Sequence, residues 1–116
     1  MSATNNAIRV AFEPIRELAF GGITNVYAAV GTPFLYPCRM LVLFNNTDVL
    51  LAVSFDGVTD HLAIPGGGQI IFDFTTNRSD FGGYFVLPVG TEIWVAAPFG
   101  NPTINEFFAT VIYGQD

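Results

Sequence analysis

Charged side chains are unusually scarce in this chain. Asp, Glu, Lys and Arg make up 12% of the 116 residues, whereas about a quarter is usual in a soluble domain. Lysine is absent, the four cations are all arginines, and aromatic residues reach 15%. A domain of this size leaves much of its surface exposed, so it cannot bury all of this apolar material internally. Interface cores are poor in Lys and Glu and rich in aromatic residues and Arg. We therefore expect other copies or partner proteins to cover part of the surface.

The balance of charge argues against two classes of partner. The net charge is −6, and a direct nucleic-acid partner requires cations that displace counterions from phosphates. The four arginines (Arg9, Arg16, Arg39 and Arg78) are scattered along the chain. Mean hydropathy is positive, at +0.47, but the charge-free run 18–38 is interrupted by glycines and prolines that a membrane-spanning helix would not tolerate. We expect neither nucleic acid nor membrane as a direct partner.

The apolar pattern predicts about eight short strands and no amphipathic helix. Apolar and polar residues alternate with a period of two, or form short apolar runs between turn residues. The expected strands cover residues 8–13, 39–44, 49–55, 61–64, 69–75, 84–87, 91–97 and 106–113. We predict one hairpin from 39–44 and 49–55, joined by the polar residues 45–48, and another from 84–87 and 91–97. The segment 14–20 fits either strand or helix.

Short strands with turns between them indicate an all-β fold, an antiparallel β-sandwich of jelly-roll type, with residues 1–116 as a single domain. The strands at 40–44 and 49–53 are apolar on both faces, so they need cover on both sides. Residues 7–36 are punctuated by Gly and Pro and have two interpretations. They form an extended arm across a neighbouring subunit, or two further strands and a loop of the same sandwich.

The chain offers few groups for nucleophilic or metal chemistry. Cys38 and His61 are its only cysteine and histidine, too few to complete a zinc site or a disulfide. A triad of Ser54 or Ser79 with His61 lacks the Gly-x-Ser-x-Gly context. The glycines 66–68 precede a strand rather than a helix, so they do not indicate a phosphate loop. We interpret Cys38 as a small apolar filler and predict no cofactor.

The carboxylates are better explained by roles in turns or at the solvated surface than by catalysis. Asp56, Asp60 and Asp73 are the candidates for acid–base or glycosidase chemistry. Asp56 lies in an Asp-Gly turn, where its side chain favours the turn backbone, and Asp73 lies on the polar face of its strand. A calcium site made by Asp56, Asp60 and Asn46 matches no known ligand spacing. We predict no catalytic residue and no metal site.

Aromatic residues supply the remaining candidates. Buried or interfacial anchoring is the commonest role of Trp and Tyr in small β domains, and we predict interface positions at Phe20, Tyr27, Phe34, Tyr36 and Trp94. The alternative is an aromatic platform for sugar, built from Trp94 with Phe81, Tyr84 and Phe99. In that case the chain would be a carbohydrate-binding module, such as part of a host-adhesion device. A small hydrolase is a third possibility.

A longer pattern resembles a known class of proteins. Residues 44–48 (Phe-Asn-Asn-Thr-Asp), 53–58 (Val-Ser-Phe-Asp-Gly-Val), 64–67 (Ile-Pro-Gly-Gly) and 72–74 (Phe-Asp-Phe) are similar to small all-β virion proteins of tailed bacteriophages. The resemblance implies a non-enzymatic structural subunit located in the virion. Its partners would be other copies of itself and other virion proteins. It implies either a head–tail or tail ring, or a capsid decoration protein, and it carries over no catalytic residue.

Overall fold

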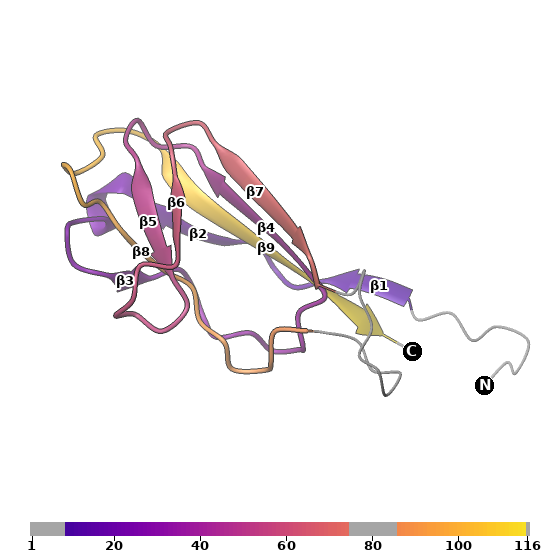
Figure 1. Ribbon diagram of the computed structural model, residues 1–116. Coiled ribbons are helices and arrows are strands. Elements are labelled where there is room, and N and C mark those ends of the chain that lie inside the picture. The colour runs from indigo at the N-terminus through magenta and orange to yellow at the C-terminus, as the bar shows by residue number, and fades with distance from the viewer. Residues whose placement is uncertain (1–8, 75–85, 116) are drawn as a thin grey trace, which may run out of the picture.

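The computed structural model describes residues 9–74 and 86–115 as two antiparallel sheets packed face to face (Figure 1). This confirms the all-β sandwich. The elements are β1 (Arg9–Phe12), β2 (Arg16–Ala19), a 3-10 turn (Phe20–Gly22), β3 (Ala28–Ala29), β4 (Met40–Asn45), β5 (Leu51–Ser54), β6 (Leu62–Ile64), β7 (Gln69–Asp73), β8 (Trp94–Ala96) and β9 (Glu106–Gln115).

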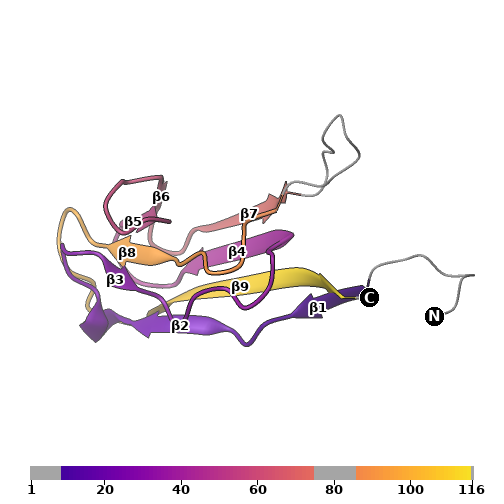
Figure 2. The same cartoon turned by 90° about the horizontal axis from the view of Figure 1, so that it is seen from below.

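Sheet A is the longer layer and has the order β1-β9-β4-β7, with β2 also paired to β9. Sheet B has the order β3-β8-β5-β6. Figures 1 and 2 both show sheet B lying along one end of sheet A, while β1 and the end of β9 extend beyond it. One stretch of sheet A therefore has no strand of sheet B over it.

The core lies between the sheets and is made by alternate residues of the central strands. Leu41 and Leu43 of β4 and Phe107 of β9 face Val53 of β5 and Val95 of β8, and all five are fully buried. Alternation along each strand buries one set of side chains and turns the other set away from the core. In β4 the burial pattern changes at every residue, as this geometry requires.

The hairpin expected from 39–44 and 49–55 is wrong. β4 pairs with β7 and β9 in sheet A, whereas β5 pairs with β6 and β8 in sheet B. Both strands are apolar on both faces, so each can lie in the middle of a sheet, and the connection between them crosses from one layer to the other. The second expected hairpin is also wrong for the described residues. Leu87 bridges to Cys38, and β8 pairs with β3 and β5.

Asn45 holds the crossing between the layers. Its side-chain amide donates to the carbonyls of Val49 and Ile64, both at 2.8 Å. Its Oδ1 accepts from the backbone N–H of Thr47 at 3.0 Å and from the Thr47 hydroxyl at 2.6 Å. The side chain is fully buried, and an unpaired polar group at such a site costs free energy. Asn45 thus substitutes for the ladder bonds that a hairpin would have supplied.

Residues 9–36 pack on their own domain in this structure, as the second interpretation of that segment describes. β1 and β2 pair with β9, and β3 pairs with β8. The undecided segment 14–20 is strand at 16–19, followed by the 3-10 turn. Ile8 lies outside the described residues.

Replacing Asn45 by Ala should destabilise the fold by about 3 kcal/mol, because two buried carbonyls and the Thr47 hydroxyl lose a partner and each unmade bond costs about 1–3 kcal/mol. Urea unfolding followed by the fluorescence of Trp94, the single tryptophan, measures the change. The matched control is Asn46→Ala, which keeps the backbone bond from Asn46 N to Glu106 O and should stay within about 0.5 kcal/mol. Equal losses for the two variants would contradict this role of Asn45.

Candidate interaction surface

The side of sheet A that faces away from sheet B is apolar. In β4 it carries Met40, Val42 and Phe44, which alternate with the core residues of that strand. The register continues each row into both neighbours. Met40 lies between Ile112 and Asp73, Val42 between Thr110 and Ile71, and Phe44 between Phe108 and Gln69. The Phe44 and Phe108 rings stack, with centroids 6.2 Å apart. We call this surface, with Val10 and Phe12 of β1, the outer face.

β1 extends the outer face to the edge of the sheet. Phe12 pairs with Ile112 and Val10 with Gly114. Val10, Phe12 and Ile71 are among the most exposed apolar residues, at 60%, 65% and 57%. The first strand of the chain is therefore amphipathic as its sequence indicates, but its apolar side points to solvent. An exposed apolar cluster of this kind marks an interaction surface in a soluble protein.

A β-bulge explains this inversion. Glu13 donates its backbone N–H to Val111 O, and Arg16 pairs with Ala109. Two residues, Pro14 and Ile15, therefore stand opposite the single residue Thr110. The extra residue shifts the alternation by one position, and proline suits the site because it has no N–H to donate. As a result Glu13 and Arg16, three apart, point to the same inner side of the sheet.

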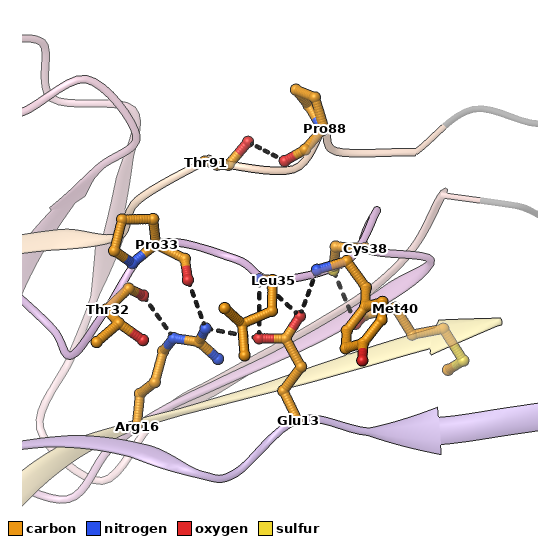
Figure 3. Close-up of polar contacts among 10 residues, drawn as sticks. Glu13, Arg16, Thr32, Pro33, Leu35, Cys38, Met40, Pro88 and Thr91 are labelled. Atoms are coloured by element: carbon orange, nitrogen blue, oxygen red, sulfur yellow. Dashed lines mark hydrogen bonds and ion pairs between the residues drawn. The ribbon is translucent and has the colours of Figure 1, made fainter. Parts of the chain in front are cut away.

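These two side chains form a buried ion pair that binds the segment 32–36 (Figure 3). Arg16 Nη2 donates to Glu13 Oε1 at 2.6 Å and to Pro33 O at 3.0 Å, and Arg16 Nε donates to Thr32 O at 2.8 Å. The guanidinium lies over the Phe34 ring, 5.3 Å from its centroid. Arg16 Nη1 is buried with no hydrogen-bond partner among the described residues. Pro33 and Thr32 thus anchor the guanidinium from the opposite segment.

The Glu13 carboxylate completes the anchor by accepting backbone bonds. Leu35 N donates to Oε2 at 3.1 Å and to Oε1 at 3.3 Å, and Tyr36 N donates to Oε2 at 3.0 Å. Gly31, at φ +70°, lets this segment approach, because a Cβ there would lie 2.8 Å from Arg16 Cγ. We call the pair and its backbone partners the Glu13–Arg16 clamp. It fixes β1 and β2 relative to the 32–36 segment.

The predicted interface residues do not gather on the outer face. Phe34 is 2% exposed and belongs to the core, so its assignment to an interface is corrected: its ring packs inside its own domain beneath Arg16. Phe20 and Tyr36 are exposed, and Tyr36 stacks on Tyr113 with ring centroids 3.9 Å apart. Tyr27 and Trp94 are half-buried.

The Asp56 carboxylate, a candidate for acid–base chemistry, accepts hydrogen bonds within the turn that follows β5. Asp56 Oδ1 accepts from the N–H groups of Val58 and Thr59, at 2.8 and 2.7 Å, and from the Ser54 hydroxyl at 2.8 Å. These hydrogen bonds, with the Thr59 bond foremost, hold the pKa of Asp56 well below its usual value, because each stabilises the ionised form. His61 Nδ1 accepts from Phe55 N at 3.1 Å. Asp56 therefore caps its own loop.

Asp60 and Cys38 are likewise committed to local structure. The Tyr27 hydroxyl donates to Asp60, and burial together with this contact raises the pKa of Tyr27 to about 12. Cys38 is fully buried, and burial raises the pKa of its thiol to about 11. Its Sγ donates to Met40 O at 3.1 Å. Across residues 9–74 and 86–115, no group of three or more His, Cys, Asp or Glu side chains is arranged to hold a metal ion. Ser79 lies outside that part of the chain.

Half of the proposed sugar platform can be located. One face of the Trp94 ring lies against Gly57, where a Cβ would be 3.2 Å from the indole, so that face is covered by the chain itself. Phe99 is 88% exposed. Phe81 and Tyr84 lie outside the described residues.

Comparison with known proteins identifies no relative. No family model matches the chain, and neither a curated protein nor a solved structure shows significant similarity to it. In the described part of the chain, no helix has the length and apolar character needed to cross a bilayer.

Replacing Arg16 by Met should lower the free energy of unfolding by about 3–5 kcal/mol, because it leaves the Glu13 carboxylate buried without a counter-charge. The matched control is Arg9→Met, which removes the same charge from an exposed position and should change stability by about 0.5 kcal/mol at most. The double variant Glu13→Gln/Arg16→Met should recover part of the loss. Additive losses in that double-mutant cycle would show that the two side chains do not act as a pair.

The thiol of Cys38 should be almost inert in the folded protein. At pH 8 a pKa of about 11 instead of 9.0 reduces the thiolate fraction, the reactive form, by about 100-fold, and burial slows attack further. Iodoacetamide labelling followed by mass spectrometry should be slow in buffer and fast in urea. Rapid labelling of the native protein would show that Cys38 is accessible and ionised.

Proposed function

We propose that this chain is a non-enzymatic structural subunit that assembles with copies of itself through the outer face of sheet A. Its resemblance to small all-β proteins of tailed bacteriophages supports a role in a virion, as part of a head–tail or tail ring or as a capsid decoration. Assembly would be non-covalent. Apolar, low-charge surfaces would be buried between subunits, and no covalent bond would be made or broken.

One observation carries the proposal: the outer face is apolar across four strands. Its two central strands contribute Met40, Val42 and Phe44 of β4 and Phe108, Thr110 and Ile112 of β9. The charged residues Glu17 and Asp73 lie at the ends of these rows, on the edge strands, and Glu106 lies at the start of β9. The centre of a protein–protein interface is depleted of charge in the same way. Burying this face against another subunit would cover the side of β4 that faces away from sheet B.

The strand order supports a jelly-roll classification. β1 and β2 flank the same side of β9 and are joined by the bulge, so they count as one strand interrupted at Pro14. Renumbering the eight resulting strands gives the orders 1-8-3-6 and 2-7-4-5. These are the orders of a double-sheet jelly roll, an architecture shared by viral capsid and lectin domains. The classification is therefore compatible with the virion role and with the carbohydrate-binding alternative.

The candidate reactive groups support a role without catalysis. The Asp56 carboxylate, the His61 ring nitrogen and the Cys38 thiol each hold a backbone or neighbouring side-chain group in place. A nucleophile and its base must lie within hydrogen-bond reach of one another. Here the contacts of these groups are those of turns and of the core.

Placing a charge in the outer face should weaken self-association. Val42→Lys puts an ammonium in the middle of the face, where burial against a second copy would leave it unpaired. We expect the dissociation constant measured by sedimentation equilibrium to rise at least about tenfold, which corresponds to about 1.4 kcal/mol.

The matched control is Val58→Lys. Val58 is 82% exposed in the loop after β5, and the substitution changes the net charge by the same amount without touching the outer face. It should leave the dissociation constant within about twofold. The proposal fails if the wild-type protein is a monomer at millimolar concentration, or if the two lysine variants weaken association equally.

A glycan array separates assembly from sugar binding. A structural subunit should give no selective signal on the array. Strong, selective binding that disappears in Trp94→Ala, with folding preserved by circular dichroism, would favour the carbohydrate-binding module instead.

A further inference from the structure

The two edges of sheet A are complementary to one another, and we propose that β1 of one copy pairs with β7 of the next copy as adjacent antiparallel strands. Successive copies would then share one continuous sheet, in a closed ring or an open row. This inference rests on the proposed self-assembly and adds a second contact, made between strand edges, which leaves the outer face free to be buried against a further subunit.

The edge of β1 that faces away from β9 pairs with no other described strand and carries the backbone groups of Val10 and Phe12. In an antiparallel pair, alternate residues bond to the partner strand and the others turn their N–H and C=O outward. The bond from Glu13 N to Val111 O, at 3.0 Å, sets the phase for the β1–β9 register. Ala11 and Arg9 therefore face β9, whereas Val10 and Phe12 present a donor and an acceptor each to the open edge.

The edge of β7 that faces away from β4 pairs with no other described strand and carries the backbone groups of Gln69 and Ile71. The bonds from Phe74 N to Arg39 O and from Asn45 N to Gly68 O, both at 2.9 Å, set the phase for the β4–β7 register. Ile70 and Phe72 therefore face β4, and the residues between them point outward. On both edges, the residues with outward backbone groups are those whose side chains lie on the outer-face side of the sheet.

The direction of the strands makes the two edges match. The path β1-β9-β4-β7 has four strands and every neighbouring pair is antiparallel, so β1 and β7 run in opposite directions. A rotation about an axis along the strands brings β7 of one copy beside β1 of another as an antiparallel neighbour, with both outer faces on the same side. Val10 and Phe12 then come beside Ile71, and the apolar outer face continues from one copy to the next.

The stretches of the two edges that would pair are unprotected, although the bulge at Pro14 follows β1 directly and Asp73 ends β7. Natural edge strands are shortened, bulged at the centre, or given lysines and prolines. Residues 10–12 and 69–72 contain no charge and no proline, and the chain has no lysine. Subunits of net charge −6 repel one another, so uncharged edges suit the approach of a like-charged copy. In sheet B the edge strands β3 and β6 have only two and three residues, too short for a comparable ladder.

Two proline variants test the pairing by complementation. Val10→Pro removes an outward donor from β1, and Ile71→Pro removes one from β7. Neither removes a bond of the protein's own ladder, because both N–H groups point away from the partner strand, and proline is tolerated at such edge positions. Circular dichroism and urea unfolding establish that each variant is folded before its mass is measured by sedimentation.

We expect each variant alone to lose the edge contact and to sediment at a lower mass than the wild type, and an equimolar mixture to sediment at a higher mass than either variant alone. In the mixture the intact β1 of the Ile71→Pro protein can pair with the intact β7 of the Val10→Pro protein, and the two remaining edges are blocked. If only Val10→Pro lowers the mass, the contact is β1 with β1, and if only Ile71→Pro does so it is β7 with β7. Either result overturns the proposal. Undiminished association of both variants would overturn the edge pairing while leaving assembly through the outer face intact. A monomeric wild type would overturn both.

Cross-linking provides a second measurement should a proline variant not fold. Val10→Cys and Ile71→Cys are made separately in a Cys38→Ala background, one of them isotope-labelled, and treated with a short bismaleimide. The mixture should give a dimer with one labelled and one unlabelled chain, and neither variant alone should cross-link. Cross-linking of Val10→Cys with itself, or no cross-linked dimer in a mixture that sediments as an assembly, would overturn the proposal.

Discussion

The buried contact between Glu13 and Arg16 is the interaction on which the arrangement of sheet A depends. The pair spans the bulge at Pro14 and Ile15, and it binds four backbone groups of the 32–36 segment. A buried charge pair is favourable only when its remaining donors and acceptors are also satisfied, and the peptide groups of Thr32, Pro33, Leu35 and Tyr36 do most of this. The clamp therefore fixes where the alternation of the first strand changes phase. On one side of the bulge Val10 and Phe12 turn outward, and on the other Leu18 turns toward the core.

That change of phase gives the protein an apolar layer on each side of sheet A. The inner layer is covered by sheet B and by the segments that carry Phe34 and Leu87, whereas the outer layer has no described segment of the chain over it. With four arginines and no lysine, the chain has few of the long cationic side chains that commonly lie across such surfaces and keep them hydrated. Burial of the outer face by a neighbouring subunit would therefore stabilise the contact between the two. In the assembly that we propose, the outer face and the edges of β1 and β7 would make two adjoining contacts.

Several polar side chains away from this surface hold the connections between strands. Asn45 replaces a hairpin at the point where the chain crosses between sheets, Asp56 caps the loop after β5, and Asp48 accepts from both the backbone N–H and the hydroxyl of Thr103. These hydrogen bonds also lower the pKa of Asp48. A sandwich with this strand order needs such reinforcement, because most of its connections pass from one sheet to the other and cannot use the two-residue turns of a simple hairpin.

Composition and alternation by themselves determined the all-β class, the approximate strand positions and the presence of too much apolar surface for one small domain. The all-β class and the strand positions follow from a period of two, which is a local property of the sequence. The excess of apolar surface follows from the composition of the whole chain and from the ratio of surface to volume of a small domain. Strand partners were decided only in the tertiary structure, because β4 and β5 are equally apolar and a polar connection between them is compatible with a hairpin or with a crossing. The side to which Val10 and Phe12 point was decided there too. It depends on one extra residue at the bulge, and that residue is stabilised by the contact of Glu13 and Arg16 with a segment about twenty residues further along the chain.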